Sequence, residues 1–174
     1  MKLLSHLSPN GDRLPEPADL RKLALGLGAW DEVIASAEDV HAAYLARSWS
    51  AAGPGKRLLA SIFGNSPFLT GIAVQDWAFL NRLVEEGADP LLAEIAANVE
   101  ATQDLGEDTA ALMRRLRVAK RRVALVAAVA ELAGTWSLEQ QTEALSRFAA
   151  AALSAALRHL LREAARKEIG RAHV

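Results

Sequence analysis

The chain has 174 residues, of which 51% are hydrophobic and 24% charged, values that exclude intrinsic disorder and fit one domain with a substantial core. Cysteine is absent, which excludes a disulfide framework and a thiolate metal site. The net charge of −1 is unevenly distributed, because residues 1–106 hold 8 Lys or Arg against 14 Asp or Glu, whereas residues 107–167 hold 11 against 6. The basic second half favours an anionic partner, unless its cations are simply solvated.

Residues 1–17 are predicted to form an irregular arm, because prolines and a glycine interrupt them at Pro9, Gly11, Pro15 and Pro17. This segment has no continuous apolar stretch and therefore does not fit a signal peptide. The most apolar run of the chain, 123–130, is much shorter than the ~20 residues of a membrane span. We therefore expect a soluble, cytoplasmic protein without membrane contact.

Short helices separated by glycine and proline are predicted from residue 18 to about residue 104. The first begins after Asp19, a suitable N-cap, and ends before Gly26 or Gly28. A second begins at Asp31 and ends by Gly53, with an apolar stripe that includes Val40 and Tyr44.

The punctuation between residues 54 and 104 is clearer. Gly64 is expected to end a helix in the left-handed conformation, and Ser66 is expected to cap the next one, with Phe68 facing inward. Gly87 ends a helix that starts at Asp76, and one more helix follows.

After these short helices, apolar residues at steps of three and four predict one long central helix over 107–134, which Gly134 ends. Its first half is basic and its second half aliphatic. Ser137 and Gln140 then form a capping box for a last helix, whose apolar positions include Leu138, Leu145, Phe148, Leu153, Leu157 and Leu160. The short connection predicts that the last helix lies antiparallel to the central one.

The predicted fold is therefore all-α, a bundle of about six to seven helices around one long central helix. The helical domain is expected over 18–167. Residues 168–174 are expected to be a non-native tail, in which Gly170 ends the helix. Residues 169–174 match the translation of a common sequencing-adapter string, ATC GGA AGA GCA CAC GTC followed by a stop codon. We accordingly expect the natural reading frame to continue past Lys167, and other codons at these positions would contradict this.

No catalytic motif is present in the sequence. The four histidines, His6, His41, His159 and His173, are isolated, and no phosphate loop, nucleophile elbow or paired-carboxylate motif occurs. We predict no metal site in this chain.

The candidate contact residues are the cations of the central helix, which could meet a phosphate-bearing ligand, an acidic protein or a nucleic acid. They are Arg114, Arg115, Arg117, Lys120, Arg121 and Arg122. Structural salt bridges are the alternative interpretation. Nucleic acid is disfavoured, because the run lacks aromatic residues for base stacking and the whole chain is slightly acidic.

Three segments together resemble a known family. FGNSPFLTGIAVQDWAFL (63–80), LMRRLRVAKRRVALVAAVAELAG (112–134) and WSLEQQTEALSRFAAAALSAALRHLLREA (136–164) are similar to the N-terminal region of the bifunctional glutamine synthetase adenylyltransferase and adenylyl-removing enzymes. The resemblance covers about 57–166, and none of its blocks is a catalytic signature.

The resemblance implies an enzyme with two nucleotidyltransferase-like halves, which attach AMP from ATP to a tyrosine of glutamine synthetase and remove it by phosphorolysis with release of ADP. It implies Mg²⁺ in both halves, and control by a PII-type signal protein and glutamine. The helices would precede the first nucleotidyltransferase core. This sequence contains neither the Gly-rich segment nor the Asp-x-Asp pair of that core. No catalytic or metal residue can therefore be assigned, and we expect this chain alone to be inactive.

Two other interpretations remain open at this point. The chain could be a free-standing helical module that binds an acidic partner through residues 114–122, or a nucleic-acid binder that uses the same cations.

Overall fold

The computed structural model describes the backbone of residues 2–10, 14–101 and 108–172, and the side chains of residues 2–7, 14–101 and 108–166. Every regular element in these ranges is an α-helix, so the all-α prediction is confirmed. The helices are α1 (Lys2–Asn10), α2 (Leu20–Ala35), α3 (Val40–Ser50), α4 (Gly53–Asn65), α5 (Pro67–Gln75), α6 (Trp77–Glu86), α7 (Ala88–Ala101), α8 (Thr109–Leu132) and α9 (Leu138–Ala172). The described residues thus form nine helices, more than the six to seven expected.

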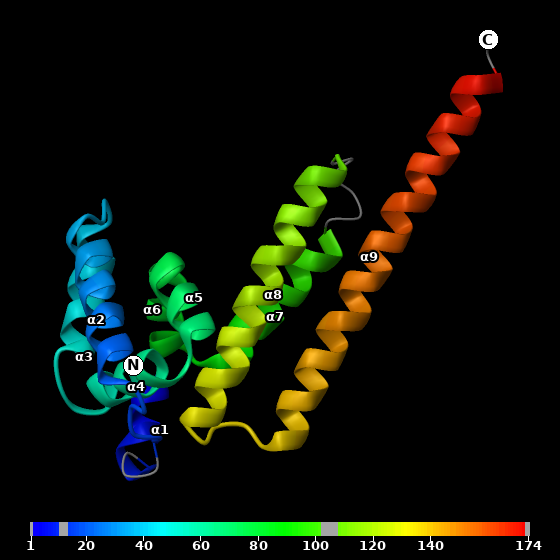
Figure 1. Cartoon of the computed structure of the whole chain (residues 1–174). Helices are drawn as coiled ribbons and strands as arrows, with labels where there is room; N and C mark the ends of the chain where they lie inside the picture. Colours follow the sequence, from blue (N-terminus) through cyan, green and yellow to red (C-terminus); the bar gives the residue numbers. More distant parts are fainter. Residues whose placement is uncertain (1, 11–13, 102–107, 173–174) are drawn as a thin grey trace.

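The helices fall into two groups that meet at α8. Figure 1 shows helices α1 to α6 clustered on one side, and α7, α8 and α9 beside one another on the other. Helix α8 contacts α5 and α6 of the first group and α7 and α9 of the second. Helix α9 runs antiparallel to α8. The predicted central helix and its antiparallel partner are therefore confirmed.

Helix α8 begins and ends at the signals in its sequence. The Asp108 carboxylate accepts a hydrogen bond from the backbone N–H of Ala111 at 2.6 Å, which caps the first turn. Gly134 follows the helix with a φ of 64°, and the N–H of Thr135 donates to the carbonyl of Ala130 at 2.9 Å. The helix ends there because a positive φ is incompatible with a right-handed α-helix, and glycine adopts that conformation readily.

The expected irregular arm is wrong over residues 2–10, which form α1. Leu3, Leu4 and Leu7 recur at helical spacing and are buried, with 1%, 8% and 0% exposure. Helix α1 contacts α6 and α4. The prolines and glycine on which the prediction depended lie at or after its last turn, so three leucines decide the local structure.

Helix α2 does not end at Gly26 or Gly28, as predicted, but continues to Ala35. Gly26 is buried against α4, where an added Cβ would lie 2.7 Å from Cγ of Phe63. This glycine lets two helices approach closely. The next break falls at residues 36–39, and α3 starts after Asp39, which caps Ala42 at 2.9 Å. Within α3, Val40 and Tyr44 are exposed rather than part of a buried stripe.

Gly64 was expected to take a left-handed conformation, but it is an ordinary residue of α4. An added Cβ there would lie 2.2 Å from Cβ of Pro17. Its neighbour Asn65 fixes the same segment, donating to the carbonyl of Glu16 at 3.0 Å and accepting from the N–H of Ala18 at 3.1 Å. Gly64 and Asn65 therefore hold the segment that precedes α2 against the end of α4.

The N-cap predicted at Ser66 is confirmed, because its hydroxyl accepts from the N–H of Leu69 at 3.2 Å. Phe68, which was expected to face inward, is 59% exposed. In that helix the inward positions are Ile72 and Ala73.

Three aromatic residues form the centre of the first group. The ring centroids of Trp30 and Trp49 are 5.5 Å apart, and those of Trp30 and Phe63 are 6.3 Å apart. The indole N–H of Trp49 donates to Oδ1 of the buried Asn81 at 2.9 Å, which links α3 to α6. Gly55 packs against the same tryptophan, since its Cβ would lie 2.0 Å from the carbonyl oxygen of Trp49.

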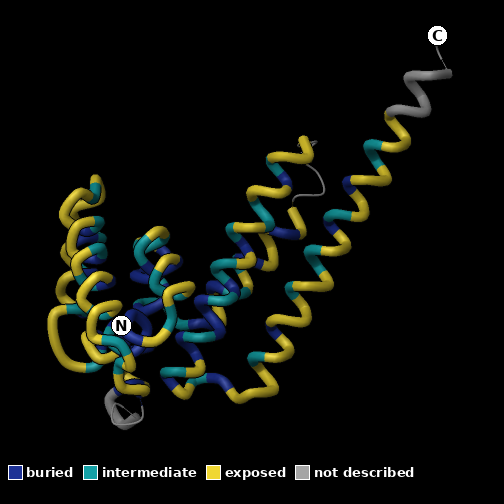
Figure 2. Tube along the Cα trace, in the orientation of Figure 1, coloured by how far each residue is buried: buried dark blue, intermediate teal, exposed yellow. Residues whose placement is uncertain are grey.

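Helix α9 extends beyond its partners, and most of it is exposed, as Figure 2 shows. The capping box at its start is confirmed, since the Ser137 N–H donates to Gln140 Oε1 at 2.8 Å and the Gln140 N–H to Ser137 Oγ at 3.3 Å. The helix continues through Gly170 to Ala172, so the expected helix end at Gly170 is wrong. The origin of residues 168–174 stays a prediction.

The apolar face predicted for α9 is only partly correct. Phe148 is half-buried against the core. The leucines assigned to this face, Leu138, Leu145, Leu153, Leu157 and Leu160, are all exposed. The residues buried instead are Ala144, Ala155 and His159. Alanine packs here because it permits close approach of the helices α9 and α8.

Candidate interaction site

The six candidate cations lie on the first half of α8, and the structure divides them into two groups. Arg122 forks the carboxylate of Asp76, with Nε to Oδ2 at 2.7 Å and Nη2 to Oδ1 at 3.2 Å. Its guanidinium carbon lies 4.7 Å from the ring centroid of Phe79. Arg121 donates to the side-chain oxygen of Gln75. Both arginines therefore tie α8 to the junction between α5 and α6. For these two residues, the contacts fit a structural role within the fold.

Arg115 is tied to the neighbouring helix instead. It is half-buried and donates from Nη2 to the backbone carbonyl of Asn98 on α7 at 3.1 Å. That carbonyl lies in the last turn of its helix, where cations are stabilised by the helix dipole.

The other three cations, Arg114, Arg117 and Lys120, are exposed. Among the residues that the structure describes, none of the three has a hydrogen bond or an ion pair. They follow one another at three-residue steps, so they lie on successive turns of one side of α8. We call Arg114, Arg117 and Lys120 the free basic triplet.

A cavity of about 390 Å³ lies beside the triplet, between α7 and α8. Arg114, Arg115 and Arg122 line it together with apolar side chains such as Ile95 and Val99. The guanidinium of Arg122 is already engaged by Asp76.

A second cavity of about 400 Å³ lies between α7, α8 and α9 and is mostly apolar. Trp136 and Phe148 line it, and its polar margin includes Asp89, Glu143 and Arg147. The indole N–H of Trp136 donates to Oδ1 of Asp89 at 2.9 Å. This bond fixes the turn between α8 and α9 against the start of α7.

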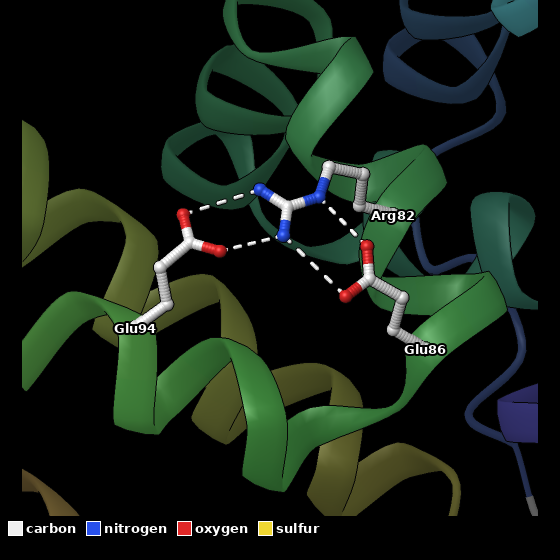
Figure 3. A network of polar contacts seen from close by, with 3 residues as sticks. All are labelled: Arg82, Glu86 and Glu94. Atoms are coloured by element: carbon white, nitrogen blue, oxygen red, sulfur yellow. Dashed lines mark hydrogen bonds and ion pairs between the residues drawn. The ribbon is translucent and has the colours of Figure 1, made fainter.

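A charge network between α6 and α7 involves a residue that sequence analysis did not select. Figure 3 shows Arg82 of α6 between Glu86 of the same helix and Glu94 of α7. Its Nε lies 2.7 Å from Glu86 Oε1, and its Nη2 lies 2.6 Å from Glu94 Oε2. Hydrogen bonds from Arg82 hold the pKa of Glu94 below its usual range, and they raise the pKa of Arg82. The four-residue spacing from Arg82 to Glu86 was the only signal of it in the sequence.

The histidines do not gather into a site. His6 and His41 are exposed, and His159 is buried with Nε2 2.9 Å from Oγ1 of Thr109. His173 lies outside the described residues. Within the described ranges no three His, Cys, Asp or Glu side chains are grouped in a way that could hold a metal ion. Nor does any helix in these ranges have the length and apolar character needed to cross a membrane.

Over the described ranges, the fold and the site define an all-helical protein with a group of exposed cations on the surface of α8. Comparison with known proteins identifies its family. The family model described as glutamate-ammonia ligase adenylyltransferase matches residues 56–173, and the chain belongs to this family.

The relatives carry one name, bifunctional glutamine synthetase adenylyltransferase/adenylyl-removing enzyme. The relative from Agrobacterium fabrum is 36% identical over 132 residues, which is 74% of this chain and 13% of the relative. The relative from Caulobacter vibrioides is 41% identical over 107 residues, 60% of this chain and 10% of the relative. One from Bradyrhizobium sp. strain BTAi1 is 32% identical over 153 residues, 88% and 15% respectively.

The matched region therefore spans only 10% to 15% of the length of these relatives. No solved structure matches the chain.

Proposed function

We propose that this chain is the N-terminal helical part of a bifunctional glutamine synthetase adenylyltransferase and adenylyl-removing enzyme. The supporting observation is the family match over residues 56–173 in a chain that spans 13% of its Agrobacterium relative. In this proposal the intact enzyme attaches AMP from ATP to a tyrosine of glutamine synthetase and removes it by phosphorolysis, with Mg²⁺ in both reactions. A PII-type signal protein and glutamine control the balance in the cytoplasm. The helices described here support the first nucleotidyltransferase core.

The chain by itself is inactive in this proposal. Nucleotidyl transfer needs carboxylate-held Mg²⁺ to neutralise the charge that develops on phosphate oxygens. The sequence has no Asp-x-Asp pair that could supply those carboxylates. The purified chain, mixed with adenylylated glutamine synthetase, phosphate and Mg²⁺, should release no ADP, whereas the Caulobacter enzyme in the same assay should. Turnover by the chain would contradict the proposal.

The DNA that encodes the chain provides a second test, independent of activity. We expect the natural reading frame to continue past codon 167 into a Gly-rich segment and an Asp-x-Asp pair. A genomic frame that ends after Val174, with nothing catalytic behind it, would favour the free-standing interaction module instead.

The free basic triplet is proposed to contact an acidic surface, either of glutamine synthetase or of the rest of the enzyme. Its supporting observation is that Arg114, Arg117 and Lys120 have no partner among the described residues. In a binding assay with glutamine synthetase, Arg114→Glu combined with Arg117→Glu should abolish binding. Arg57→Glu, an equally exposed charge reversal on α4, should not. Equal effects of both changes would refute a specific contact, and a salt-dependent gel shift would favour nucleic acid.

A further inference from the structure

We draw no further inference here: the strongest candidate, the patch of exposed leucines on the second half of α9 (Leu153, Leu157, Leu160 and Leu161), carries none, because nothing in the structure shows what covers it.

Discussion

Arg122→Ala is the substitution that most directly separates a structural cation from a binding cation on α8. The Arg122 side chain is 30% exposed and that of its partner Asp76 is 27% exposed. A forked pair at this burial stabilises the fold by about 1–2 kcal/mol, between the values of exposed and buried ion pairs. The position of its guanidinium over the Phe79 ring adds about 0.5–1 kcal/mol. Removal of Arg122 should therefore lower the free energy of unfolding by about 2 kcal/mol.

Urea unfolding followed by circular dichroism measures this change. Arg117→Ala is the matched control, because Arg117 lies on the same helix without a partner among the described residues, and its loss should change stability by about 0.5 kcal/mol or less. A double-mutant cycle with Asp76→Ala should give a coupling energy of about 1 kcal/mol or more. Equal stability of the two alanine variants, or a coupling energy near zero, would refute the structural role of Arg122.

Three further predictions concern the core, the glycines and the charge network. Asn81→Leu should cost about 1–3 kcal/mol in urea unfolding, because the buried indole N–H of Trp49 loses its acceptor; a neutral result would mean that water replaces it. Gly55→Ala should lower the melting temperature, by a loss of about 1–3 kcal/mol from overpacking, whereas Gly28→Ala, with open space around its Cβ, should gain up to about 1 kcal/mol. Glu94→Gln should flatten the acid limb of the stability curve. The lowered pKa of Glu94 stabilises the fold at neutral pH, and this contribution is lost as pH falls below the usual value of 4.5; an unchanged acid limb would contradict it.

Helix ends could be predicted from the sequence wherever the signal was local. Asp19 accepts from the N–H groups of Arg21 and Lys22, as an N-cap should. Gly87 and Gly134 have φ values of 92° and 64°, which explains why helices end before them. Each of these signals involves residues only a few positions apart, so a single sequence contains all the information.

Two glycines were assigned wrongly from the sequence, because their constraint comes from residues far away along the chain. Gly26 and Gly64 looked like helix ends, but they lie inside α2 and α4. Their real constraint is close contact with Phe63 and Pro17, each more than thirty residues away along the chain. A glycine that ends a helix and a glycine that admits a neighbour are identical in sequence. Only the packing of α2 on α4 distinguishes them.

The partners of the candidate cations on α8 also lie far away along the chain. The sequence located six cations on one helix, but it could not separate the three that are paired from the three that are exposed. The partner of Arg122 is Asp76, 46 residues earlier, and Arg121 reaches Gln75 at the same separation. Their spacing on α8 is also compatible with a single exposed stripe. The free basic triplet thus became visible only when α5 and α6 were placed beside α8.

Helix α9 shows how hydrophobic periodicity can merge two surfaces into one. Its alanines and leucines alternate so closely that the sequence suggested a single inward face. In the fold, the narrow space beside α8 accepts Ala144 and Ala155, while Leu145 and Leu153, one and two residues away from them, turn outward. Small side chains are selected where two backbones approach closely, and large ones where a deeper contact must be filled. The exposed leucines therefore form a second surface of α9, which the sequence pattern did not separate from the inward one.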